Sequence, residues 1–314
     1  MGNLMVGLLW AMSTAWGGSG PWVPGSGSGS VYLGLDGQQF ARVGSGSGAQ
    51  REVLDVGEGV NLLSAQGIVT YGIAPRAEVE ARLPYHFHHV NREDAALCAG
   101  LGEDGCAPTH TAGVIYSHLK VLVADEVSGA PVSVSVGALS RFGGLVHGTR
   151  HRLTNAGEGT IDGGGFVSVG RSGGLGKGYW TVFGDVGGQV RVPNTRSYPN
   201  QQGSRPVPGS ELFGSLEALF APQRRVSFGP AANLLWRPAG VDFAEIRLAD
   251  PDRFGALRVT HVAAGAKLIF RDPHDNAFVF GLHRTVLAVN NPSDQFGISV
   301  GVALNRLFDA EGDD

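Results

Sequence analysis

The sequence has few charged residues and lacks any run of basic ones. Charged residues make up 17% of the 314 positions, and the formal net charge is −4. Binding of DNA or RNA needs a basic patch or stripe, so we expect no nucleic-acid partner. After residue 16, no apolar stretch approaches the roughly 20 residues of a transmembrane helix. This excludes helical membrane spans from the rest of the sequence.

Cysteine is scarce as well. Cys98 and Cys106 are the two in the sequence, and a glycine-rich stretch separates them. In an exported protein, this close pair predicts one disulfide that closes a small loop. The alternative is a metal site completed by His110, although this spacing matches no standard zinc motif.

Glycine, in contrast, is in large excess. It occupies 50 positions, more than twice its usual frequency of ~7%. Each glycine weakens a helix interior by about 1 kcal/mol, which argues against a helical bundle. The glycines follow no strict three-residue period, which excludes collagen. The composition therefore predicts an all-β chain.

The amino terminus has the pattern of an export signal. Residues 4–12 form a short apolar core, and the small residues at 13–15 follow it. This pattern predicts a signal peptide over residues 1–15, with a buried amino-terminal strand as the alternative. Residues 16–29 are rich in glycine, serine and proline and predict a flexible lead-in.

Strand-like alternation recurs through the rest of the sequence. In residues 76–83, charged side chains alternate with apolar ones, as in a strand with one polar and one apolar face. The same pattern is found at 30–41, 60–71, 112–124, 131–142, 164–171, 178–191, 210–221, 225–236, 257–270, 277–290 and 296–308. Many of these stretches reach the ~9–11 residues that a tilted membrane strand needs. We therefore expect a transmembrane antiparallel up-and-down β-barrel of about 12 strands over residues 30–308, followed by an acidic tail at 309–314.

The connections between these stretches alternate in length. Short ones lie near 72–76, 125–130, 172–177, 221–224 and 271–276, and long ones near 91–111, 143–163, 192–209 and 237–256. Outer-membrane barrels have short periplasmic turns and longer external loops, whereas a soluble sandwich gives no reason for this order. Since unpaired backbone groups are costly in lipid, the first strand must pair with the last.

Aromatic residues fall near the ends of the expected strands: Tyr71, Tyr85, Phe142, Trp180, Phe220, Trp236, Phe270 and Phe308. Such positions predict girdles at the two membrane interfaces. The alternative is that these rings form the core of a soluble β protein.

Two motifs carry a family resemblance. The stretch Pro21-Trp22-Val23-Pro24, followed by residues 31–34, resembles the mature start of the outer-membrane transporter family labelled MetA-pathway of phenol degradation. Residues 71–79 and 83–85 resemble the second hairpin of that family. The resemblance covers residues 21–90 and carries no catalytic residues. It implies an outer-membrane barrel for the passage of aromatic compounds or other small molecules.

Charged residues are expected on the inner face of such a barrel, because the lumen is wet. The predicted lumen-lining residues are Glu78, Glu80, Arg82, His118, Lys120, Lys267 and His283. The inward residues of three later strands are small: Ser227, Gly229, Ala231, Ala263, Gly265, Gly297, Ser299, Gly301 and Ala303. Small inward residues are expected to leave free width for a channel.

Histidines offer two weaker candidates. His86 and His88 share a face after Pro84, and neutral imidazoles bind zinc, copper or nickel. We favour the simpler interpretation that they are rim histidines, so no metal site is assigned. His283 and Thr285 also share a face, as in some outer-membrane lipid hydrolases, but no orienting carboxylate can be identified. No catalytic residue is therefore assigned.

The sequence thus predicts a channel or transporter of the bacterial outer membrane, and not an enzyme. Its solutes are small molecules, with aromatic or hydrophobic compounds as a candidate class, and no cofactor is expected. The other expected partners are outer-membrane lipid and the barrel-assembly machinery, which reads the last strand. The alternatives are a structural or surface-binding barrel that acts through its external loops, and a barrel lipid hydrolase.

Overall fold

The computed structural model describes residues 20–45, 52–90, 109–142, 160–193, 209–240, 242 and 258–305. The signal peptide expected at 1–15, residues 16–19 of the lead-in, the Cys98–Cys106 pair and the acidic tail at 309–314 lie outside these residues. Among the described residues, no helix is long and apolar enough to cross a membrane.

Twelve long antiparallel strands form the wall of the molecule in the described part of the chain. They are β1 (Gly29–Ser45), β2 (Glu52–Ala74), β3 (Ala77–Val90), β5 (Ile115–Ala124), β6 (Ser133–Phe142), β7 (Thr160–Leu175), β8 (Gly178–Pro193), β9 (Glu211–Gln223), β10 (Val226–Arg237), β11 (Val259–Arg271), β12 (Ala277–Val289) and β14 (Phe296–Asn305). Two short strands, β4 (Thr109–Ala112) and β13 (Asn291–Pro292), pair with β3 and β1, and η2 (Glu126–Ser128) is a single 3₁₀ turn.

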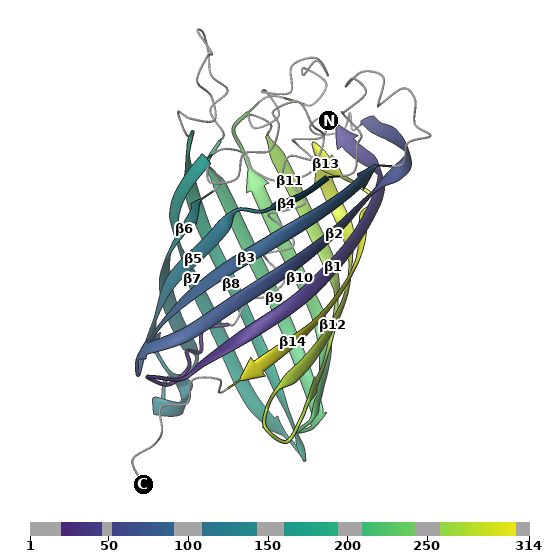
Figure 1. Ribbon diagram of the computed structural model, residues 1–314. Coiled ribbons are helices and arrows are strands. Elements are labelled where there is room, and N and C mark those ends of the chain that lie inside the picture. The colour runs from purple at the N-terminus through teal and green to yellow at the C-terminus, as the bar shows by residue number, and fades with distance from the viewer. Residues whose placement is uncertain are drawn as a thin grey trace.

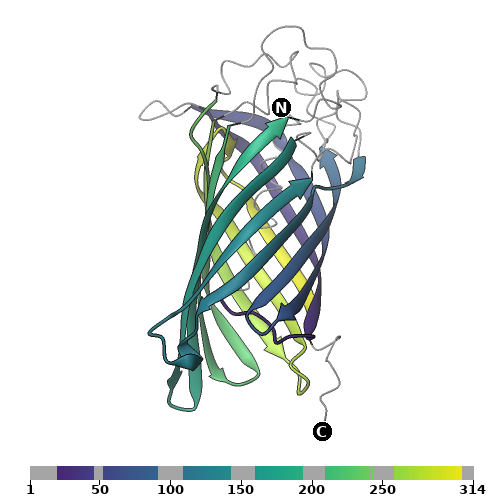
Figure 2. The same ribbon diagram turned by 90° about the vertical axis from the view of Figure 1, so that its left-hand side faces the viewer.

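The strands close into a barrel. β1 pairs with β2 along one edge and with β14 along the other, from Ser30 opposite Asn305 to Gln39 opposite Phe296. The strands run at a tilt around one cylinder (Figures 1 and 2). The expected pairing of the first strand with the last is confirmed, so backbone donors and acceptors along this seam are satisfied within the sheet.

The two faces of the wall have opposite chemistry. Apolar side chains point outward, and Leu33, Leu83 and Val123 are more than half exposed (58%, 54% and 57%). Polar side chains such as Ser135 and Glu78 point inward and are 0% exposed. A water-soluble sandwich would bury the apolar face instead. This arrangement is that of a transmembrane barrel.

Exposed aromatic rings stand on the outer face at Tyr71, Tyr85, Phe142, Trp236 and Phe270, and all of these except Tyr85 are near the end of a strand. Trp180 and Phe220 are half-buried, and the ring of Phe220 packs edge-on against Phe228 at 5.7 Å. The exposure of these rings shows which face they are on, and the girdles at the two membrane interfaces stay a prediction. Phe308 lies outside the described residues.

Tight turns join the strands at one end of the barrel. They include Pro75–Arg76, Gly176–Lys177 and Arg224–Arg225, and Gly176 has a φ of +61°, a backbone conformation that favours glycine. In outer-membrane barrels the short turns are periplasmic. We therefore call this end the periplasmic end and the opposite end the outer end.

Residues 20–28, which precede β1, make specific contacts at the periplasmic end. Gly20 and Pro21 are buried. The Gly27 amide donates to the carbonyl of Gly72, and the Gly72 amide donates to the carbonyl of Ser28. A Cβ at Gly72 would lie 2.2 Å from the carbonyl oxygen of Gly25, so only glycine fits at this position. The sequence predicts a flexible lead-in here, whereas the structure packs these residues against the barrel wall.

Candidate lumenal binding site

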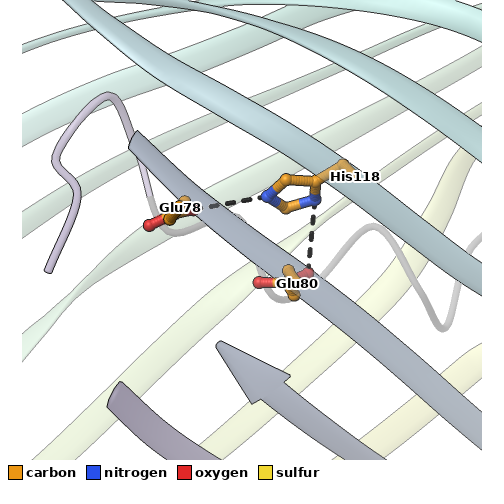
Figure 3. A group of neighbouring side chains, drawn as sticks. All are labelled: Glu78, Glu80 and His118. Atoms are coloured by element: carbon orange, nitrogen blue, oxygen red, sulfur yellow. Dashed lines mark hydrogen bonds and ion pairs between the residues drawn. The ribbon is translucent and has the colours of Figure 1, made fainter. Parts of the chain in front are cut away.

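The first group of inward polar residues comes from two neighbouring strands. The register of β3 and β5 places Glu78 opposite Lys120 and Glu80 opposite His118, and the alternation of both strands turns these side chains inward. His118 lies between the carboxylates, with Nε2 3.3 Å from Glu78 and Nδ1 3.6 Å from Glu80 (Figure 3). Arg82 pairs with Glu80. We call these five residues the β3–β5 cluster.

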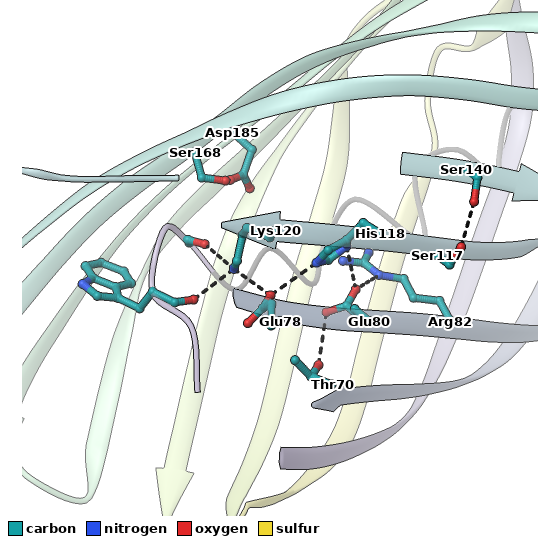
Figure 4. Close-up of polar contacts among 12 residues, drawn as sticks. Thr70, Glu78, Glu80, Arg82, Ser117, His118, Lys120, Ser140, Ser168 and Asp185 are labelled. Atoms are coloured by element: carbon teal, nitrogen blue, oxygen red, sulfur yellow. Dashed lines mark hydrogen bonds and ion pairs between the residues drawn. The ribbon is translucent and has the colours of Figure 1, made fainter. Parts of the chain in front are cut away.

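Lys120 connects the β3–β5 cluster to the residues before β1 (Figure 4). Its Nζ lies 2.9 Å from the Glu78 carboxylate and donates to the backbone carbonyls of Gly20 and Trp22 at 2.8 and 2.9 Å. The Trp22 ring then packs edge-on against Phe183 at 5.8 Å. One buried ammonium therefore holds the amino-terminal residues inside the periplasmic end, where they narrow the lumen.

The β3–β5 cluster also has the composition of a metal site. Ligand atoms of Glu78, Glu80 and His118 lie within 4.8 Å of one another, and carboxylates and imidazoles are common metal ligands. However, Lys120 and Arg82 already pair with the two carboxylates. A divalent cation would be repelled by these fixed charges, so we assign no metal here.

A second group of charges lies at the outer end, and the sequence analysis missed it. It consists of Arg141, Asp162, Gln189, Arg191, Glu211 and Arg237, from five consecutive strands, β6 to β10. Glu211 is its centre: Arg191 Nη1 donates to it at 3.0 Å and Arg237 Nε at 3.1 Å. Asp162 lies 3.5 Å from Arg191. We call this group the upper arginine cluster. The alternation within each strand could have indicated that each of these side chains points inward. Only the register between strands shows that they meet.

The lumen also contains a cavity, which borders the β3–β5 cluster at Glu80. This cavity of about 430 Å³ extends from Trp22 to the opposite wall. Its apolar lining comes from the side chains of Trp22, Ile68, Phe183, Leu219, Ile269 and Val279. Its polar lining includes Asp36, Glu80, Glu217, Lys267 and Arg271. Lys267, one of the predicted lumen residues, pairs with Glu217.

The small inward residues do not leave the free width that the sequence suggests. A Cβ on Gly301 would lie 2.2 Å from the Tyr32 hydroxyl, and one on Gly297 would lie 2.1 Å from the His283 ring. These glycines therefore make room for rings from neighbouring strands. The expectation of open space along this wall is wrong at these two positions, because cross-strand neighbours fill it.

Of the other predicted histidines, His86 and His283 are buried in the described part of the chain. His86 is buried, and its Nδ1 lies 2.7 Å from Ser64 Oγ; the side chain of His88 lies outside the described residues. His283 is 2% exposed on the inner face. The hydroxyl of Thr285 bonds to His261 Nε2 at 2.9 Å, a histidine that the sequence analysis did not single out.

This histidine–threonine pair does not form a triad within the described residues. His261 Nδ1 has no hydrogen-bond partner there, whereas an activated hydroxyl needs a base that is itself oriented by a third group. The hydrolase alternative therefore gains no support from the described part of the chain.

One turn beside the amino-terminal residues is fixed by a carboxylate. Glu126 in η2 accepts hydrogen bonds from the backbone and hydroxyl of Ser172 at 3.0 and 2.5 Å. Burial raises the pKa of Glu126, but hydrogen bonds from Ser172 and the Trp22 side chain outweigh it and hold the pKa below its usual range. Glu126 is therefore ionised at neutral pH and holds η2 against β7.

The closed barrel, its apolar outer face and its polar lumen define an integral β-barrel of the bacterial outer-membrane type. No family model and no curated protein matches the sequence. The structure is similar to an outer membrane channel from Pseudomonas putida F1, at 12% identity and a TM-score of 0.61, over 92% of this chain and 98% of that one.

Two further solved structures are similar at lower scores. The NanC porin is 8% identical, with a TM-score of 0.42, over 86% of this chain and 98% of that one. The Pseudomonas putida toluene transporter TodX is 9% identical, with a TM-score of 0.34, over 94% and 91%. At these identities the comparisons concern the fold alone.

Proposed function

We propose that this chain is an outer-membrane channel for small hydrophobic molecules. The observation that carries the proposal is the cavity of about 430 Å³ inside the barrel, with Trp22, Phe183 and Ile269 in its lining. Cavities of this size and apolar character hold small organic ligands. The barrel resembles in fold a protein described as an outer membrane channel, which supports the same function.

The distribution of charge favours hydrophobic over hydrophilic cargo. The β3–β5 cluster and the upper arginine cluster consist of ion pairs that are nearly inaccessible to water, with Glu78, Lys120 and Arg237 each at 1% exposure or less. A porin for hydrophilic solutes keeps its charges in an aqueous path. Here the charges of the two clusters pair with one another, and the cavity offers apolar side chains such as Trp22, Phe183 and Ile269 beside its polar groups.

The proposal is tested with a substitution that fills the cavity. Leu219 lines the cavity from β9, and Leu219→Trp would occupy part of it. Leu216 lies on the outer face of the same strand and is 56% exposed, so Leu216→Trp is the matched control that adds the same ring to the lipid side.

Passage is measured as uptake of ethylbenzene into vesicles with a lipopolysaccharide outer leaflet, since a hydrocarbon partitions directly into plain phospholipid. We expect Leu219→Trp to slow protein-dependent uptake at least several-fold and Leu216→Trp to leave it unchanged. Equal uptake by both variants and the wild type would refute passage through the cavity. No protein-dependent uptake at all would favour the surface-binding alternative.

A further inference from the structure

Arg271 at the periplasmic end of β11 differs from other inward basic residues in the described part of the chain. Its Nη1 donates to the hydroxyls of Tyr179 and Ser227 at 3.1 and 2.9 Å, and both of these groups are neutral. Lys120, Arg82 and Lys267 each pair with a glutamate. No carboxylate of the described residues pairs with Arg271.

The guanidinium of Arg271 has N–H groups that make no hydrogen bond with the described residues. It carries five N–H groups in a planar fork, and the two hydrogen bonds that it makes both come from Nη1. Nε and Nη2 make none with the described residues. The side chain is half-buried and borders the cavity together with Trp22, Phe183 and Ile269. A positively charged fork therefore borders the same cavity as these three apolar side chains.

Three carboxylates border the same cavity, and two of them pair with other basic residues: Glu80 with Arg82 and Glu217 with Lys267. Asp36 is aligned with Lys267 through the pairs Asp36–Ser299, Ser299–Gly281 and Gly281–Lys267. Arg271 follows Lys267 by four residues, about 13 Å along a strand, toward the periplasmic end. Glu217 pairs with Lys267 itself. Glu80 and Glu217 are thus already neutralised by other residues, and Asp36 is in line with Lys267 and not with Arg271.

We infer that Arg271, with the Tyr179 hydroxyl, is a binding site for the carboxylate of a small amphipathic acid. An arginine fork matches a carboxylate with two parallel hydrogen bonds, and the Tyr179 hydroxyl can donate a further one. The apolar body of the ligand would lie against Trp22, Phe183 and Ile269. This inference rests on the proposed function and names a substrate class for it, namely aromatic or aliphatic carboxylates.

The test compares three ligands that share one apolar body and differ in the polar group. Equilibrium dialysis of the full-length purified protein measures binding of 4-ethylbenzoate, 4-ethylbenzyl alcohol and 4-ethylbenzylamine. We expect the carboxylate to bind roughly tenfold or more tightly than the other two, since hydrogen bonds to charged groups are the stronger kind. Arg271→Gln should abolish this preference and leave binding of the alcohol unchanged.

Two control variants keep the result interpretable. Arg225 is an exposed arginine in the turn at the same end of the barrel, and Arg225→Gln should retain the preference for the carboxylate. Arg271→Lys keeps the charge and loses the fork, so it should retain only part of the preference.

The outcomes separate the two proposals. Equal binding of acid and alcohol by the wild type, or an undiminished preference in Arg271→Gln, would overturn the carboxylate site and leave the channel for hydrophobic molecules in place. Failure of all three ligands to bind would overturn both proposals.

Discussion

The position of the amino-terminal residues depends on Lys120, so the substitution Lys120→Met should open the periplasmic end. The ammonium donates to two backbone carbonyls, those of Gly20 and Trp22. A hydrogen bond from a charged donor contributes about 1.5–3 kcal/mol. The two hydrogen bonds together therefore stabilise the bound position of these residues by at least about 3 kcal/mol. Losing that energy raises the population of the released state by a factor of roughly 150.

Two measurements report this release. Single-channel recording in planar bilayers should show a larger or more frequently open conductance for Lys120→Met than for the wild type. Amide hydrogen exchange should rise at Gly27, whose N–H bonds to the carbonyl of Gly72 at 2.8 Å, because local opening exposes such groups.

The matched control is Lys267→Met. It removes the same charge from the lumen and leaves Glu217 without its cation, just as Lys120→Met does for Glu78. Lys267 pairs with Glu217 of β9, whereas Lys120 donates to the carbonyls of Gly20 and Trp22. If Lys120→Met and Lys267→Met change conductance and exchange equally, or if neither changes them, the tether is refuted.

Three further outcomes follow from the lumen and the predicted external loop. Replacing Glu78 and Glu80 together by glutamine leaves the cations of the β3–β5 cluster uncompensated. The zero-current potential in a KCl gradient should therefore shift toward anion preference. An unchanged potential would place the cluster outside the conducting path. Glu211→Gln leaves three buried guanidinium groups around a neutral amide and should destabilise the barrel by about 3–5 kcal/mol. Heat-modifiability gels should show this as a lower unfolding temperature. An unfolding temperature equal to that of the wild type would contradict the prediction. Cys98 and Cys106, which lie outside the described residues, should appear as one disulfide in non-reducing mass spectrometry, and two free thiols would contradict it.

The fold was accessible from sequence because one local rule governs it. Alternation in residues 76–83 separates the lipid face from the lumen face, and the structure confirms it: Val79 is exposed at 39% while Glu80 is buried. Closure of the first strand on the last follows from the same requirement that backbone groups be paired in lipid. Strand ends were less predictable, because β2 and β3 extend well past the apolar pattern.

The site was only partly accessible, because it depends on contacts between strands far apart in sequence. The facing of Glu78 and Lys120 could be inferred from one hairpin-like pairing. The meeting of Arg141 with Glu211 requires the register of three successive strand pairs between β6 and β9. Local pattern also failed to show that the Tyr32 ring covers Gly301.

The central claim, passage of small hydrophobic molecules through the lumen, is tested most directly by comparing two uptake rates in the same vesicles. The vesicles carry a lipopolysaccharide outer leaflet and the wild-type protein, and the solutes are ethylbenzene and glucose. The cavity lined by Trp22, Phe183 and Ile269 predicts that the protein accelerates ethylbenzene entry and has little effect on glucose. Acceleration of glucose without acceleration of ethylbenzene would contradict the account.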